Sequence, residues 1–120
     1  MTFSMNRERI KALLVNCGIK EIANSKAHIP NQFPAGIVSL VKRRGVNPVS
    51  SGFADQKFRF EIFVIVKESE TADEEILQII ESVDNRLYEE QLFTEVESVV
   101  FYWNMLKASD IRVARFELEV

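Results

Sequence analysis

The longest alternation of apolar and other residues in the chain runs from Gln56 to Lys67. In an extended chain, side chains two residues apart project from the same face of a sheet, so one face of this segment must be buried. That face carries Phe58, Phe60, Ile62, Val64 and Val66. The other face is charged in its first half and apolar near its end, with Lys57, Arg59, Glu61, Phe63, Ile65 and Lys67. A strand of this length spans roughly 40 Å, against a radius of gyration of about 13 to 14 Å for a compact domain. The pattern therefore predicts a strand that crosses the domain or projects from it.

Three other segments have the alternation of strands. Ala35 to Arg43 is apolar on both faces, and Val99 to Leu106 is bulky on both faces, which is typical of an interior or interfacial strand. From Asp110 to the C-terminus the inward positions are Ala114, Phe116, Leu118 and Val120, and the outward ones are charged. The short connection from 107 to 110 predicts a hairpin between the last two strands.

Two segments have helical periodicity. Ser4 or Asn6 can cap a first helix, whose apolar stripe of Ile10, Leu13, Leu14 and Cys17 ends at Gly18. Thr71 and Glu74 have the spacing of a capping box and begin a second helix, with Ile76, Ile80, Val83 and Leu87 on one face. The order of elements predicts a single α+β domain over residues 1–120, with a four-stranded, mostly antiparallel sheet and both helices packed on one face.

Two connections have distinct compositions. Residues 23–33 precede Pro34 and contain Pro30, so we expect an ordered loop that enters the sheet. Residues 44–55 combine glycine, proline, asparagine and serine with Val46, Val49 and Phe53. That composition predicts a long, flexible hairpin loop, and its apolar residues favour an arm that becomes ordered on contact with a partner.

Composition narrows the classes of function. With 120 residues and 47% hydrophobic content, the chain can bury a core without disulfides or metal. Its net charge of −3 argues against a surface that binds nucleic acid. Cys17 is the sole cysteine, which suits a reducing cytoplasm. We expect a soluble chain without a secretory signal or a membrane span, because no stretch is apolar and long enough for either.

The residues of this sequence give little support for an enzymatic function. His28 is the sole histidine and has no sequence neighbours suited to a catalytic triad or a zinc site. The acidic runs 73–75 and 89–90 are better explained by helix capping and by a solvated helix end than by acid–base or metal chemistry. The phosphate-binding glycine motifs are absent from the sequence. We therefore expect no enzyme activity, no cofactor and no metal.

A hairpin would bring five cationic residues into one neighbourhood: Lys42, Arg43, Arg44, Lys57 and Arg59. They could bind phosphate, or an acidic helix of a neighbouring subunit such as the one with Glu74, Glu75 and Glu81, or they could form a solvated hairpin tip that discourages aggregation. The negative net charge favours protein contact over nucleic acid. Tyr102 and Trp103 alternate along a strand, so one of these two rings requires cover that helices on a single face cannot supply.

The chain resembles the tail terminator (minor tail) proteins of long-tailed bacteriophages. The similarity lies in an N-terminal helix before FPAGIVSLVKR at 33–43, a flexible hairpin loop, the strand FRFEIFVIV at 58–66, a helix at 74–87 and two closing strands. The resemblance implies a structural protein that forms a ring, a hexamer in that family, which terminates the tail tube and provides the joint to the head. A neck protein of the head–tail joint, or a small dimeric ligand-binding module, is the alternative.

The resemblance also implies partners and contact residues. The partners are other copies in the ring, the tail tube protein and a head-completion or neck protein, while DNA passes through the pore without specific binding. The location implied is the virion, at the head–tail junction of the tail, after assembly in the host cytoplasm. The candidate subunit or tube interface comprises Arg43, Arg44, Phe53, Lys57, Arg59, Glu61, Tyr102 and Trp103.

Overall fold

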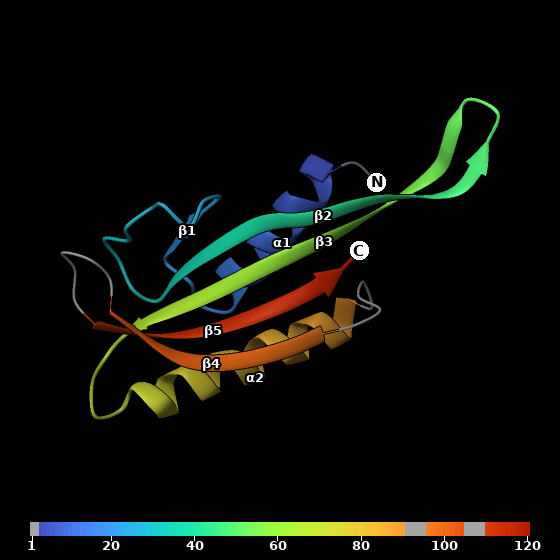
Figure 1. Ribbon diagram of the computed structural model, residues 1–120. Helices are drawn as coiled ribbons and strands as arrows, with labels where there is room; N and C mark the ends of the chain where they lie inside the picture. The colour runs from blue at the N-terminus through green and yellow to red at the C-terminus, as the bar shows by residue number, and fades with distance from the viewer. Residues whose placement is uncertain (1–2, 91–95, 105–109) are drawn as a thin grey trace.

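The computed structural model describes residues 3–90, 96–104 and 110–120, and of the side chains at 96–104 only those of 100 and 101. The helices are α1 (Phe3–Asn16) and α2 (Ala72–Glu90). The strands are β1 (Glu21–Ala23), β2 (Ala35–Val49), β3 (Gly52–Lys67), β4 (Val96–Asn104) and β5 (Asp110–Glu119). They form one sheet in the order β1-β2-β3-β5-β4 (Figure 1).

The expectation of a four-stranded, mostly antiparallel sheet was wrong. The sheet has five strands and is mixed, because β1 pairs with β2 in parallel while the other pairs are antiparallel. β1 is only three residues long, from Glu21 to Ala23, which is too short to show an alternating pattern. Its backbone runs beside Ala35 to Ile37, so it covers only the start of β2. The fold is still α+β.

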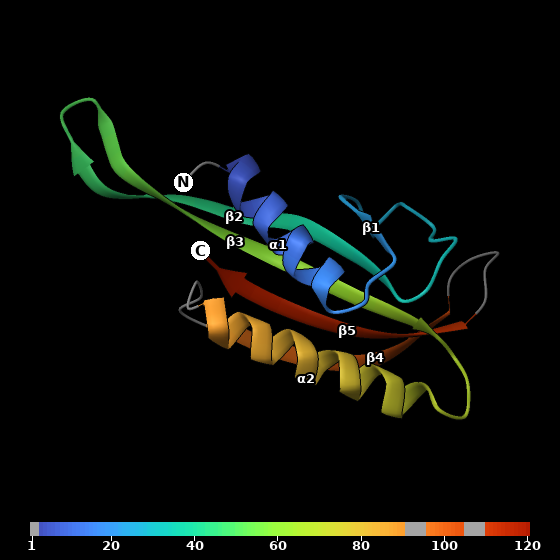
Figure 2. The same ribbon diagram turned by 180° about the vertical axis from the view of Figure 1, so that it is seen from behind.

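Both helices cover the same face of the sheet, where the main core lies (Figure 2). Ile10, Leu13 and Leu14 of α1 are buried against the strands, and the positive φ of Gly18 (88°) lets the chain turn after the helix. α2 begins at Ala72, and the Thr71 hydroxyl donates to the carboxylate of Glu75 (3.2 Å), one residue later than the capping box predicts. The face of β3 expected to be buried is buried throughout: Phe58, Phe60, Ile62, Val64 and Val66.

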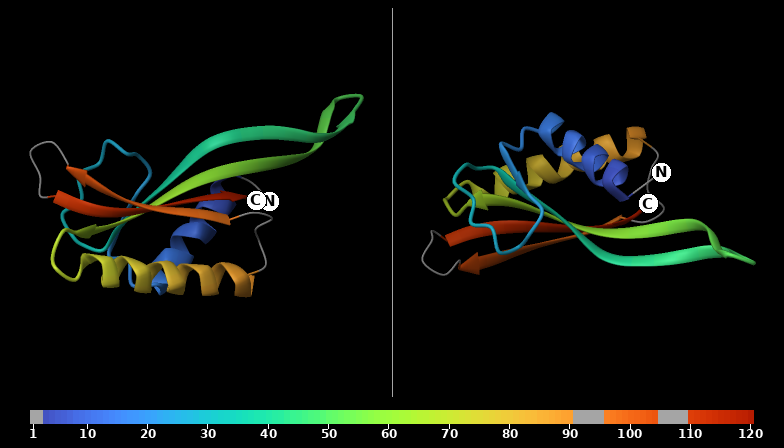
Figure 3. Two further views of the ribbon diagram at one scale, coloured as in Figure 1. Left: turned by 60° about the horizontal axis from the view of Figure 1, so that its bottom comes forward. Right: turned by 90° about the horizontal axis from the view of Figure 1, so that it is seen from above.

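The opposite face of the sheet, called here the helix-free face, has a second and smaller core at one end. Its buried residues are Ala35, Ile37, Phe63, Ile65, Ile111 and Val113, and Phe33 and Phe101 pack against them. The loop from 24 to 34 crosses to this face (Figure 3). Its Lys26 ammonium lies over the Phe63 ring (5.1 Å), and Lys67 lies over the Phe33 ring (5.4 Å). The loop thus supplies cover that the helices cannot give to this face.

β2 and β3 continue as a two-stranded hairpin beyond the rest of the sheet (Figure 1). Residues 44–55, expected to be a flexible loop, are instead paired strands that reach Val49 and resume at Gly52. The molecule is elongated as a result, with extents of 56 × 31 × 20 Å and a radius of gyration of 15.4 Å. The long strand therefore projects from the domain, as its length predicts.

Candidate interaction surface

Beyond Phe58, toward its tip, the hairpin of β2 and β3 no longer pairs with β5. The β5 ladder ends with the Phe58 amide donating to the Val120 carbonyl (3.0 Å) and the Val120 amide donating to the Phe58 carbonyl (2.8 Å). On the helix side, Phe3 packs its ring on those of Phe58 and Phe60, with centroids 5.8 Å away in both cases. These contacts anchor the base of the hairpin. We call residues 42–57, which begin at this base and extend beyond it, the arm.

The tip of the arm carries apolar side chains that its own chain leaves open. Val49 is 52% exposed and Phe53 is 54% exposed. The Phe53 ring nevertheless packs on the arm itself, because it lies against the backbone of Gly45. Asn47 takes a positive φ (58°) and its side-chain amide donates to Asp55 (2.9 Å) across the hairpin. The tip is therefore an ordered turn with an exposed apolar surface.

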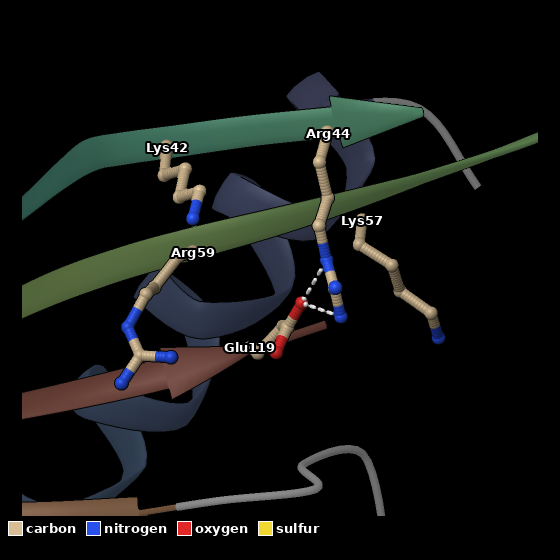
Figure 4. A pocket seen from close by; sticks show the side chains of 5 residues that line it. All are labelled: Lys42, Arg44, Lys57, Arg59 and Glu119. Atoms are coloured by element: carbon tan, nitrogen blue, oxygen red, sulfur yellow. Dashed lines mark hydrogen bonds and ion pairs between the residues drawn. The ribbon is translucent and has the colours of Figure 1, made fainter. Parts of the chain in front are cut away.

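At the base of the arm, four cationic side chains surround an open hollow on the helix-free face (Figure 4). The hollow has a volume of about 150 Å³ and is lined by Lys42, Arg44, Lys57, Arg59 and Glu119. We call the four cations the basic cluster. They share a face because Lys42 pairs with Arg59 and Arg44 with Lys57 in the antiparallel register, after a bulge between Leu40 and Lys42.

The basic cluster is only partly neutralised. Arg44 contacts Glu119 at 2.7 Å, and Arg59 contacts Glu117 at 3.2 Å. Lys42 and Lys57 have no carboxylate partner within the described residues. Two ammonium groups thus remain available at the mouth of the hollow, and the arrangement can accept carboxylate or phosphate oxygens.

Glu61 lies further along the same face and is only 7% exposed. It accepts from Lys26 at 2.7 Å and from Arg115 at 2.5 Å, and Arg115 also contacts Glu117. Burial acts to raise the pKa of the Glu61 carboxyl, but the hydrogen bonds from Lys26 and Arg115 outweigh it and hold that pKa below its usual value. The same hydrogen bond raises the pKa of the Arg115 guanidinium. Glu61 therefore ties the 24–34 loop to the sheet and is not open to a partner.

His28 has a structural contact in the same loop. Its Nε2 lies 3.2 Å from the Glu21 carboxylate, which also accepts the Asn31 amide at 2.9 Å. The Asn31 amide is the main cause of the lowered pKa of Glu21. Phe33 packs against the second core. His28 and Phe33 thus both help to hold this loop against the sheet.

The candidate interface residues are brought together only in part. Arg44, Lys57 and Arg59 lie in the basic cluster, and Phe53 is at the tip. Arg43 pairs with Phe58 on the other face and donates to Gln56 (3.0 Å). The side chains of Tyr102 and Trp103 lie outside the described residues, although their backbone belongs to β4.

Glu119 is the member of the hollow that sequence reasoning missed. It was assigned only to an outward face, and the signal that could have found it is the alternation of Arg115, Glu117 and Glu119. Antiparallel pairing with β3 places Glu119 opposite Arg59 and Glu117 opposite Glu61. The charge ladder across two strands could thus be derived once the register was known.

Within residues 3–90, 96–104 and 110–120, no three histidine, cysteine or acidic side chains gather closely enough to hold a metal ion. Neither helix in the described part of the chain has the length and apolarity that a membrane span requires. Comparison of the sequence with protein-family models gives no match, and comparison with curated proteins gives no significant match.

Proposed function

We propose that this chain is a structural protein that assembles head to tail into a closed ring, by seating its arm on the next copy. The observation that carries the proposal is the arm itself. It extends past the end of β5 and exposes Val49 and Phe53. A two-stranded hairpin alone is at best marginally stable in water, so contact with a partner would stabilise it. Exposed apolar side chains on such an extension are typical of assembly surfaces.

The position of the arm favours a ring over a symmetric dimer. The arm leaves the sheet through β2 and β3, whereas β4 forms the opposite edge. An arm that contacts the far side of the next copy makes a heterologous interface, and such interfaces generate rings when the rotation closes. A symmetric dimer would instead require each of the two arms to reach the far side of the same partner at once, so that the two contacts are reciprocal.

Within this class, we propose that the ring, with six copies, terminates the tail tube of a long-tailed bacteriophage and forms the joint to the head. Support comes from the resemblance in sequence pattern and from the projecting hairpin at the place where that resemblance puts a hairpin loop. The partners are then the tail tube protein and a head-completion or neck protein, and DNA passes through the pore. A neck protein of the same joint is the alternative station.

Sedimentation velocity tests the role of the arm. The variant Val49→Ser/Phe53→Ser removes the apolar tip, and we expect it to remain a folded monomer where the wild type forms a ring. The matched control is Val15→Ser/Ile29→Ser, which removes two apolar side chains of similar exposure (59% and 53%) away from the arm. The proposal fails if the tip variant assembles as the wild type does, or if the wild type forms only a compact dimer.

A further inference from the structure

One flank of α2 carries exposed side chains that no packing within the described chain explains. They recur at alternating spacings of three and four residues, which places them in one continuous row along a helix. We call this row the outer stripe: Glu74, Leu77, Glu81, Asp84 and Tyr88. Leu77 is 58% exposed and Tyr88 is 82% exposed, so the stripe combines acidic and apolar groups on an open surface.

The outer stripe faces away from α1. On the opposite flank of α2, Glu90 contacts Arg9 of α1 at 2.7 Å. On the flank of the stripe, the Asp73 carboxylate instead contacts Arg112 of β5 at 2.8 Å. The stripe therefore lies toward the β4 edge of the sheet, and the arm projects from the β2 side (Figure 3). These are two different surfaces at opposite edges, as a head-to-tail contact requires.

The arm and the outer stripe match in chemistry and in length. The arm offers the ammonium groups of Lys42 and Lys57 at its base and Val49 and Phe53 at its tip. The stripe offers three carboxylates and two apolar side chains. It extends over roughly 21 Å of helix, and the arm from Lys42 to Val49 covers roughly 23 Å. One arm can therefore contact the whole stripe.

We propose that the outer stripe is the seat for the arm of the neighbouring copy. The apolar tip packs on Tyr88 at one end of the stripe, and Lys57 and Lys42, further toward the base of the arm, face the carboxylates of the stripe. This inference rests on the proposed ring and names its interface.

The two kinds of contact have separate roles. Aromatic side chains that become buried, here Phe53 and Tyr88, supply most of the affinity at an interface, whereas charge pairs set orientation and exclude wrong partners. Asp84 is consistent with such a seat, because partial burial already raises its pKa before a partner arrives. A cation from the next copy would lower that pKa again.

Charge reversal tests the pairing. The arm variant Lys42→Glu/Lys57→Glu and the helix variant Glu81→Lys/Asp84→Lys each place like charges across the interface, so each alone should lose roughly a hundredfold or more in association. When the two variants are mixed, the Glu-bearing arm meets the Lys-bearing helix, and the wild-type pairing remains at the alternate contacts. We expect rings of alternating copies. The chain with all four substitutions should also associate with itself.

The control Glu70→Lys/Glu89→Lys makes the same change in charge at exposed positions off the stripe and should assemble normally. Circular dichroism of every variant checks that it is folded. If the wild type forms rings but the reversed pair fails to rescue them, or if reversal has no effect, the seat lies elsewhere while the proposed function stands. If the wild type never associates, both the seat and the ring are overturned.

Discussion

The ring of Phe53 lies so close to Gly45 that a methyl group on Gly45 would come within 2.3 Å of its Cγ. No real Cβ occupies such a distance, so the absence of a side chain at Gly45 is what lets the ring pack on the arm. We predict that Gly45→Ala displaces Phe53 and weakens assembly. Because the site lies outside the core, the free energy of unfolding should change by less than about 0.5 kcal/mol. Chemical denaturation and sedimentation of the same sample measure both effects. Unchanged assembly would show that the packing of Phe53 on Gly45 is not needed for association.

Glu61 predicts a dependence of stability on pH. Its pKa is lowered in the folded state, so its contribution is fully present above the unfolded value of about 4.3 and is lost as the pH falls through the lowered folded pKa. Glu61→Gln should cost about 1 to 3 kcal/mol at pH 7, and the difference from the wild type should shrink in acid. Denaturation across pH measures it, with the exposed Glu89→Gln as control. A loss that persists unchanged in acid would contradict the ion pairs with Lys26 and Arg115.

Hydrogen exchange should separate the arm from the body of the sheet. Residues 45–54 pair only within the hairpin, whereas Phe60 to Ile65 pair on both sides and are buried. In a monomeric variant we expect the arm amides to exchange much faster than those of β3 near Ile62, and in the assembled protein to become protected. Strong protection of the arm in a proven monomer would count against an arm that needs a partner.

Asn6 gives a prediction for α1. It is 4% exposed, and its side-chain carbonyl oxygen has no hydrogen-bond partner among the described residues. A buried polar atom without a partner costs free energy, so Asn6→Leu should stabilise the protein by about 1 kcal/mol. Thermal unfolding measures the change. A destabilised variant would indicate that the amide has a role in the folded protein.

Much of the fold could be predicted because its elements have strong periodicity. The buried face of β3 from Phe58 to Val66, the buried row of α2 at Ile76, Val83 and Leu87, and the C-terminal strand are all where the alternation predicts them. β1 could not be predicted, because a three-residue strand is defined by its partner in space. The arm was interpreted as a loop because its glycine, proline and asparagine are typical of turns, whereas in a projecting ribbon they twist and shape the tip.

The candidate surface was predictable where sequence neighbours are also neighbours across a hairpin. Arg44 and Lys57 come together for this reason, but Arg43 lies on the other face because the bulge after Leu40 sets the register. Arg59 proved to contact Glu117, so its reversal would disturb the monomer, and Lys42 and Lys57 are the better positions for a test. Glu74 and Glu81 of the outer stripe could be named from the sequence as a possible partner of the basic cluster, but Leu77 and Tyr88 could not, because their exposure is known only from the packing of α2.

Negative-stain electron microscopy with tail tubes tests the central claim most directly. The wild type should form closed rings of six copies and cap tube ends, while Val49→Ser/Phe53→Ser should give single small particles and bare ends. Isolated particles of the wild type at every concentration, with tube ends left uncapped, would contradict the account.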